Sequence, residues 1–199
     1  MLTVAIQAGG QSSRMGEDKA LRPFLGRPLI ERVIERLRPA ADEIIVTTNR
    51  PAEYVFLGLP LFADIKPGRG ALGGLYTALR AARAPVVAVV ACDMPFASGL
   101  LLEAAFRQLL AEEADVVVAE TGAGLEPLHA VYRRVTCLPV IESAIEGGLW
   151  KVTGWFPQVR VRILPPEELK RLDPPGLAFW NINTPGEFAE AERLALAND

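Results

Sequence analysis

A glycine-containing loop with two cations lies near the N-terminus, directly after an apolar stretch at residues 2–6. The loop contains Gly9 and Gly10 and is followed by Arg14 and Lys19. Glycines let the backbone curl so that several N–H groups converge on one anion, and the two cations can offset negative charge that amides alone do not neutralise. The pattern predicts a phosphate-binding loop; the competing interpretation is a surface turn with incidental cations.

This loop differs from the two commonest phosphate-binding motifs. It lacks the Gly-Lys-Ser/Thr ending of a P-loop, and Gln11 directly after Gly9-Gly10 breaks the G-x-G-x-x-G pattern of dinucleotide-binding folds. A generic nucleotide motif therefore does not account for it.

A second chemically suggestive residue, Asp93, follows the apolar stretch at residues 86–91. Its carboxylate is expected at the C-terminal end of a central strand, where open α/β sheets bind ligands. A carboxylate at that position can hold Mg²⁺, which would bridge phosphate oxygens of a nucleotide. The alternative is an aspartate that only accepts hydrogen bonds from turn amides before Pro95.

The elements that must position these residues follow from the apolar pattern. Short, β-branched apolar stretches, typical of strands covered on both faces, alternate with amphipathic patterns of helical period. The predicted strands are residues 2–6, 44–46, 86–91 and 116–119, and the predicted helices are residues 28–37, 72–82 and 100–110. This alternation predicts an α/β fold with a mostly parallel sheet flanked by helices, in a single domain over residues 1–199.

The second half of the chain is less regular, and four prolines punctuate its tail. The predicted elements are strands at residues 128–133 and 159–164, a helix at 135–146 and a short strand at 179–182. A last helix is predicted at 185–196, with Thr184 as its N-cap and Pro185 at its first position.

Length and composition restrict the class of protein. A chain of 199 residues with 50% apolar and 23% charged residues can bury a large core. A net charge of -3 argues against nucleic acid as a partner and favours a small molecule. No apolar run approaches the roughly 20 residues of a membrane span, and no secretion signal is evident, so we expect a cytoplasmic protein, with a size that fits a monomer. Two cysteines are expected as reduced buried thiols, and a single histidine excludes a multi-histidine metal site.

The N-terminal loop also resembles the signature of a known family. The string Ala8-Gly9-Gly10-x-Ser12-x-Arg14-Met15-Gly16-x-Asp18-Lys19 resembles that of the molybdenum cofactor guanylyltransferases. The resemblance continues, in the order of the family, through Gly26-x-Pro28-Leu29-Ile30, Asn49-Arg50, Asp64, Gly73-Gly74-Leu75, Cys92-Asp93-Met94-Pro95-Phe96, Glu126-Pro127-Leu128-His129-Ala130-Val131-Tyr132 and Asn181-Ile182-Asn183-Thr184-Pro185. It implies a Rossmann-like nucleotidyltransferase fold of the glycosyltransferase-A type, which transfers GMP from GTP to molybdopterin with Mg²⁺ and releases pyrophosphate.

The resemblance also implies roles for single residues. Lys19 would approach the triphosphate and Asp93 would hold the metal, with Arg14 as a further catalytic cation. The residues expected to contact the nucleotide are Gln7, Ala8, Gly9, Gly10, Lys19, Thr47, Asn49, Asp64 and Asp93, with Asp64 at the nucleoside end. Two positions depart from the family: Gln7 stands where Leu is usual, and Thr47 replaces an Asn, so the preference for guanine is the least secure implication.

The C-terminal half is expected on the side of the second substrate. The positions at which the family handles molybdopterin are occupied here by Gly147, Gly148, Lys151, Asn181 and Asn183. Flat surfaces for a pterin ring could come from Trp150, Trp155 and Trp180. His129 is interpreted as a structural hydrogen-bonding residue, and a protein that delivers molybdopterin is a further candidate partner.

Two other functions remain open from the sequence. One is a related nucleotidyltransferase that uses CTP on the same pterin, or a nucleotide on a sugar phosphate; the residues Ala8-Gly9-Gly10 and Asp18 speak against it. The other is a nucleotide-binding protein without catalysis, against which the combination of Lys19 and Asp93 argues, because a binder needs no metal ligand opposite the phosphates.

Overall fold

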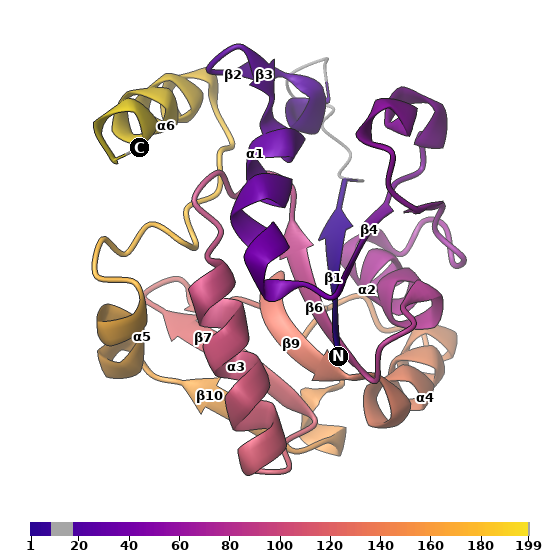
Figure 1. Cartoon of the computed structure of the whole chain (residues 1–199). Coiled ribbons are helices and arrows are strands. Elements are labelled where there is room, and N and C mark those ends of the chain that lie inside the picture. Colours follow the sequence, from indigo (N-terminus) through magenta and orange to yellow (C-terminus); the bar gives the residue numbers. More distant parts are fainter. Residues whose placement is uncertain (9–17, 199) are drawn as a thin grey trace.

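A computed structural model describes residues 1–8 and 18–198 of the chain (Figure 1). The loop residues Gly9, Gly10 and Arg14 lie outside the described residues. Within the described part, an eight-stranded sheet has the order β10-β7-β9-β6-β1-β4-β5, with β8 paired to β7. The strands are β1 (Leu2–Gln7), β4 (Glu43–Thr47), β5 (Leu61–Phe62), β6 (Val86–Ala91), β7 (Val116–Thr121), β8 (Gly124–Leu125), β9 (His129–Arg133) and β10 (Val161–Leu164).

The central strands are parallel. β1 pairs in parallel with both β4 and β6, and β10 pairs in parallel with β7, whereas β9 runs antiparallel to β6 and β7. β1 and β6 are buried almost throughout, which explains why both read as continuous apolar runs. The predicted α/β fold with a mostly parallel sheet is therefore confirmed.

Helices cover both faces of the sheet (Figure 1). The helices are α1 (Leu29–Leu37), α2 (Gly70–Ala81), α3 (Gly99–Ala111), α4 (Arg134–Glu146), α5 (Pro166–Leu172) and α6 (Pro185–Asn198). α1 and α3 share one apolar cluster with alternate residues of β1, such as Val4 and Ile6, and α2 and α4 share another that includes Ala5. The alternation along β1 is the expected period of two for side chains of a strand.

A smaller third cluster joins the C-terminal helix to the N-terminal third of the chain. It contains buried apolar side chains of a short hairpin, β2 (Pro23–Phe24) and β3 (Arg27–Pro28), and of α1 and α6. Its members are Phe24, Leu29, Phe96, Ile182, Phe188, Ala191 and Ala195. α6 is thereby packed against the hairpin, at a distance from the main sheet (Figure 1).

One expectation about the tail is wrong. Residues 179–182 form no strand, because the backbone of Ile182 bonds to Asp93 and Lys19 and not to a neighbouring strand. The structure also contains a helix that was not predicted, α5, which begins at Pro166; proline is compatible with the first turn of a helix because its missing N–H would be unpaired there anyway.

The predicted cap of the last helix is confirmed. The Glu187 N–H donates to Thr184 Oγ1 at 3.1 Å, and the Thr184 N–H donates to Glu187 Oε2 at 2.8 Å, which is a reciprocal capping box. Cys92 and Cys137 are both free, Cys137 buried and Cys92 half-buried. Among the described residues, no helix combines the length and apolarity needed to cross a bilayer.

Candidate functional site

A cavity of about 650 Å³ opens at the C-terminal edge of the central strands. The register places Gln7 of β1 beside Thr47 of β4 on one side and Ala91 of β6 on the other, so the three strands end together. Their following residues supply charged and polar side chains to the cavity, as expected for a parallel α/β sheet. The polar lining residues are Gln7, Asp18, Lys19, Asn49, Asp64, Asp93, Glu126 and Asn181.

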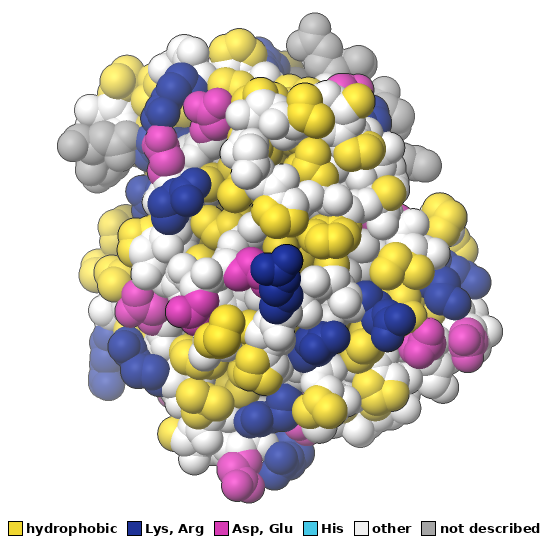
Figure 2. Space-filling model, turned by 45° about the vertical axis from the view of Figure 1, so that its right-hand side comes forward, with side chains coloured by type: hydrophobic (Ala, Val, Ile, Leu, Met, Phe, Trp, Pro, Cys, Tyr) yellow, Lys and Arg dark blue, Asp and Glu magenta, His cyan; other side chains and the backbone are white. Residues whose placement is uncertain are grey.

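The face of the molecule drawn in Figure 2 carries charges of both signs. Lys and Arg side chains are interspersed there with Asp and Glu side chains and with apolar patches.

Lys19 lines the cavity from a short 3₁₀ helix, Lys19–Leu21. Its Nζ donates to the Ile182 carbonyl oxygen at 3.0 Å and to Asn183 Oδ1 at 3.2 Å. An ammonium group has three N–H donors, so these two bonds leave one N–H for a further acceptor. The position of Lys19 is thus compatible with the role that the sequence predicts for it.

Asp18 holds the start of this 3₁₀ helix in place. Its Oδ1 accepts a hydrogen bond from the Ala20 N–H at 3.1 Å, and its Oδ2 accepts one from Tyr54 Oη at 2.6 Å and another from the Arg50 guanidinium. Tyr54 is fully buried, and burial together with its bond to Asp18 raises the pKa of its phenol. The role of Tyr54 was not predicted, since no local pattern links residues 36 positions apart.

Asp93 presents a half-buried carboxylate to the cavity. Burial raises the pKa of Asp93 above its ordinary value, although the charge of Lys19 and a hydrogen bond from the Asp93 backbone N–H act in the opposite direction. Within the described part of the chain, the carboxylate makes no hydrogen bond or ion pair with another side chain. Such a group has less compensation than carboxylates removed from water normally have in proteins.

The residues at this position fit a Mg²⁺ ion. Mg²⁺ is commonly held by one or two carboxylates, with its remaining ligands supplied by water and substrate phosphates. The described residues contain no cluster of three or more His, Cys, Asp or Glu side chains that could enclose a metal on their own. Asp93 therefore suits a metal that arrives with a phosphate ligand and not an ion enclosed by the protein alone.

Asn49 and Asp64 form a reciprocal pair at another part of the wall. Asn49 Nδ2 donates to Asp64 Oδ2 at 2.8 Å, and the Asp64 N–H donates to Asn49 Oδ1 at 3.1 Å. The pair orients one carboxylate oxygen and leaves Asp64 able to accept further bonds. Thr47, which was predicted to contact the nucleotide, is only 2% exposed and is not among the described residues that line the cavity.

The Gln7 side chain packs closely against α2. Its Nε2 is 3.4 Å from the Ala71 carbonyl oxygen, and a Cβ at Gly74 would lie only 2.9 Å from the Gln7 amide carbon. A larger residue at position 74 would therefore displace the end of the flexible Gln7 side chain. Ala8, which follows Gln7, is buried, and its N–H donates to the Thr47 carbonyl oxygen at 2.8 Å.

The three tryptophans lie in different environments. Trp150 lines the cavity, is 62% exposed, and has the Arg69 guanidinium 5.1 Å from its ring centroid. Trp155 is fully buried, whereas Trp180 stacks on Phe96. Of the three, only Trp150 is among the described residues that line the cavity.

The remaining candidates on the second-substrate side divide in the same way. Asn181 lines the cavity, whereas Gly147, Gly148, Lys151 and Asn183 are not among the described lining residues.

The structural interpretation of His129 is confirmed: its Nε2 accepts a hydrogen bond from the Ser98 N–H at 3.0 Å, and burial lowers its pKa to about 4. A neutral imidazole with this fixed partner supports the start of α3.

Comparison with known proteins gives three consistent findings. Residues 4–160 match the MobA-like NTP transferase domain. A protein of Carboxydothermus hydrogenoformans named "Probable molybdenum cofactor guanylyltransferase" is 40% identical to this chain, in an alignment that covers 97% of this chain and 96% of the relative. A "Molybdenum cofactor guanylyltransferase" of Desulfosudis oleivorans is 35% identical, in an alignment that covers 96% of this chain and 94% of the relative. The crystal structure of molybdopterin-guanine dinucleotide biosynthesis protein A from Archaeoglobus fulgidus superimposes with a TM-score of 0.85 at 27% identity, covering 98% of this chain and 99% of that one.

Proposed function

The chain belongs to the MobA-like NTP transferase family, and from this membership and the site we propose that it is a molybdenum cofactor guanylyltransferase. Its reaction transfers GMP from GTP to molybdopterin. A terminal phosphate oxygen of molybdopterin attacks the α-phosphorus of GTP, the new P–O bond forms, and the bond to the β-phosphate oxygen breaks. Pyrophosphate carries the electron pair away, and the product is the guanine dinucleotide form of the cofactor.

The chain needs no strong general base for this reaction. A phosphate monoester is already anionic near neutral pH, so positioning of the two substrates and stabilisation of charge supply the acceleration. This agrees with His129, the only histidine, being buried with a structural hydrogen bond.

Two residues carry the charge stabilisation in our proposal. The free N–H of the Lys19 ammonium donates to an oxygen of the triphosphate, and the Asp93 carboxylate holds Mg²⁺. When bound, Mg²⁺ offsets negative charge on the phosphate oxygens. Arg14, which lies outside the described residues, adds a second cation to the phosphate loop.

The nucleoside end of GTP is assigned to the opposite part of the cavity wall. Asp64, oriented by Asn49, accepts hydrogen bonds from the nucleoside, and the Gln7 amide faces the base side. Ala8, together with Gly9 and Gly10, which lie outside the described residues, is assigned to the GTP contacts on the basis of the sequence. Thr47 contributes from beneath this wall, by accepting the Ala8 N–H through its carbonyl oxygen.

We also propose how the molecule works as a whole. Residues 1–199 form one nucleotidyltransferase domain, whose N-terminal part binds GTP and whose C-terminal part faces molybdopterin. It acts as a monomer in the cytoplasm, and molybdopterin reaches it from a delivering protein.

The observation that carries the proposal is the presence of Lys19 and Asp93 in one cavity, Lys19 from the 3₁₀ helix and Asp93 from the segment directly after β6. The test is incubation of the purified protein with Mg²⁺, molybdopterin and each of GTP, CTP, UTP and ATP, with pyrophosphate release as the measurement. Release with GTP above the other nucleotides is expected. A preference for CTP would instead indicate a cytidylyltransferase, and binding of GTP without pyrophosphate release would indicate a binding protein.

A further inference from the structure

The backbone of a short peptide segment, at Ile182, connects the two charged residues of the cavity through both its N–H and its carbonyl oxygen. The Ile182 N–H donates to the Asp93 carbonyl oxygen at 3.0 Å, and the Ile182 carbonyl oxygen accepts a hydrogen bond from Lys19 Nζ at 3.0 Å. Asn183 Oδ1 accepts the second bond of Lys19 at 3.2 Å. Residues 182–183 therefore touch both the lysine and the strand end that carries the metal-binding carboxylate.

Contacts outside the cavity hold this peptide in place. The Ile182 side chain is fully buried in the cluster that contains Phe188 of α6. The N–H groups of Asn183 and Thr184 both donate to Glu187 Oε2, at 2.6 Å and 2.8 Å. The position of Asn183 thus depends on the first turn of α6.

We propose that Asn183 is a positioning residue for Lys19, and that the capping box of α6 fixes Asn183 for this purpose. This inference rests on the proposed function, because it concerns the cation that would approach the GTP triphosphate. A lysine side chain has many rotamers, and two fixed acceptors restrict it to those that direct its third N–H toward the cavity. Asn183 itself is exposed and is not among the described residues that line the cavity, so its effect on GTP passes through Lys19.

A double-mutant cycle tests this coupling. Asn183→Ala, Lys19→Ala and the double variant are compared by calorimetric binding of GTP with Mg²⁺, in the absence of molybdopterin, and by pyrophosphate release. Asn183→Ala is expected to weaken GTP binding and to lower kcat/KM for GTP by about tenfold, the loss typical of one hydrogen bond to a charged group. In the Lys19→Ala background the same substitution is expected to change neither quantity, because residues that act together are not additive.

Two results would overturn the proposal. One is an equal loss from Asn183→Ala in both backgrounds, which would mean that Asn183 does not act through Lys19. The other is a rise confined to KM for molybdopterin, which would make Asn183 a direct contact of that substrate. Binding of GTP is measured without turnover, so a failure of this inference is distinguishable from a failure of the proposed reaction, which would appear as missing pyrophosphate release in the unsubstituted protein.

A matched pair on α6 separates positioning from a general loss of helix stability. Glu187→Ala removes the acceptor of the Asn183 and Thr184 N–H groups and is expected to reduce kcat/KM for GTP by about threefold, within the range of a lost helix cap. Glu190→Ala breaks only the exposed ion pair with Arg193 on the same helix and is expected to leave kcat/KM unchanged. Equal effects of the two substitutions would contradict the role of the capping box.

Discussion

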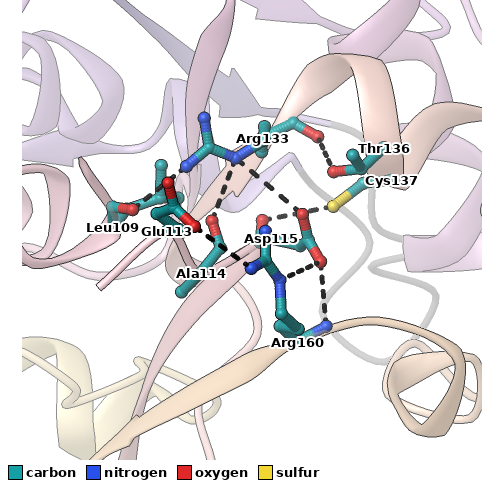
Figure 3. Close-up of polar contacts among 8 residues, drawn as sticks. All are labelled: Leu109, Glu113, Ala114, Asp115, Arg133, Thr136, Cys137 and Arg160. Atoms are coloured by element: carbon teal, nitrogen blue, oxygen red, sulfur yellow. Dashed lines mark hydrogen bonds and ion pairs between the residues drawn. The ribbon is translucent and has the colours of Figure 1, made fainter. Parts of the chain in front are cut away.

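Two aspartates lie at opposite ends of the strands of the same sheet. Asp93 follows the C-terminal end of β6 and faces the cavity, whereas Asp115 precedes the N-terminal end of β7. Asp115 is 6% exposed and is surrounded by partners: the Arg160 N–H donates to its Oδ2 at 2.9 Å, and the Arg133 and Arg160 guanidinium groups lie 3.8 Å and 3.6 Å from its oxygens (Figure 3).

The surroundings of Asp115 are themselves anchored. Arg133 also donates to the carbonyl oxygens of Ala114 at 3.0 Å and Leu109 at 3.1 Å, and the Cys137 thiol lies 3.3 Å from the Asp115 carbonyl oxygen (Figure 3). Burial alone would raise the pKa of Asp115, but the Arg160 N–H, Thr136 and the Arg160 guanidinium together lower it.

The two environments shift the pKa in opposite directions. At Asp93 the nearby charge of Lys19 and a hydrogen bond from the Asp93 backbone N–H oppose the effect of burial, but the pKa remains raised, and Lys19 already makes two other hydrogen bonds. Removing a carboxylate from water with this little compensation costs folding free energy, unless a cation from outside binds to it. The difference agrees with a stabilising role for Asp115 and with our proposal that Asp93 holds a metal ion.

The largest expected effect is the loss of activity when the charge of Asp93 is removed. Asp93→Asn keeps the shape of the side chain but removes its charge, so pyrophosphate release should fall by about 10²–10³-fold, as for loss of a main electrostatic contact to the reacting groups. The midpoint of thermal unfolding should stay the same or rise, because an uncompensated charge is removed. Unchanged activity would mean that Asp93 does not hold the metal.

The matching substitution at the other end of the strands should show the reverse. Asp115→Asn is expected to lower the free energy of unfolding by about 1–3 kcal/mol, since it leaves buried donors without their charged acceptor. The activity per folded molecule should remain, because Asp115 lies at the end away from the cavity. Urea unfolding followed by circular dichroism checks the first expectation, and pyrophosphate release at a temperature well below the unfolding midpoint checks the second.

The pH dependence of stability sharpens the contrast. The folded pKa of Asp115 is lowered, so its contribution is present above the unfolded value of about 3.9 and is lost as pH falls through the folded pKa. The pKa of Asp93 is raised in the folded protein. Its neutral form therefore stabilises the fold below the unfolded pKa of about 3.9, and this stabilisation is lost as pH rises through the folded pKa.

Urea unfolding of both Asn variants and the unsubstituted protein between about pH 3 and 7 measures these shifts. With rising pH, the stability of Asp93→Asn should increase relative to the unsubstituted protein, whereas that of Asp115→Asn should decrease. If the stability of both variants changed in the same direction with pH relative to the unsubstituted protein, the proposed difference between Asp93 and Asp115 would be wrong.

Much of this architecture could be predicted from the sequence because the patterns that determine it are local. The central strands, α1 to α4 and the Thr184 cap follow from periodicity and capping residues. Lys19 could be found from the glycine-containing loop and the family resemblance, and Asp93 from its place directly after an apolar strand. The contact between Lys19 and Ile182 joins positions 163 residues apart, and no local pattern encodes it.

The error in the tail has the same origin. Apolar residues at 179–182 are compatible with a strand, but the backbone groups of Ile182 bond to Asp93 and Lys19, which only the tertiary structure reveals. Helix α5 was not predicted, although a proline at the first helical position is favourable there.

The smallest expected effect separates the partners of Asp115 from one another. Arg160→Ala removes a guanidinium whose side chain is 64% exposed, but it retains the backbone N–H that donates to Asp115 Oδ2. Exposed ion pairs contribute little, so the free energy of unfolding should fall by only about 0.5 kcal/mol, measured by urea unfolding beside Asp115→Asn. If Arg160→Ala lowered the free energy of unfolding as much as Asp115→Asn, the exposed guanidinium, and not the buried backbone donor, would be the main partner of this carboxylate. The difference between Asp115 and Asp93 would then depend on a solvent-accessible charge.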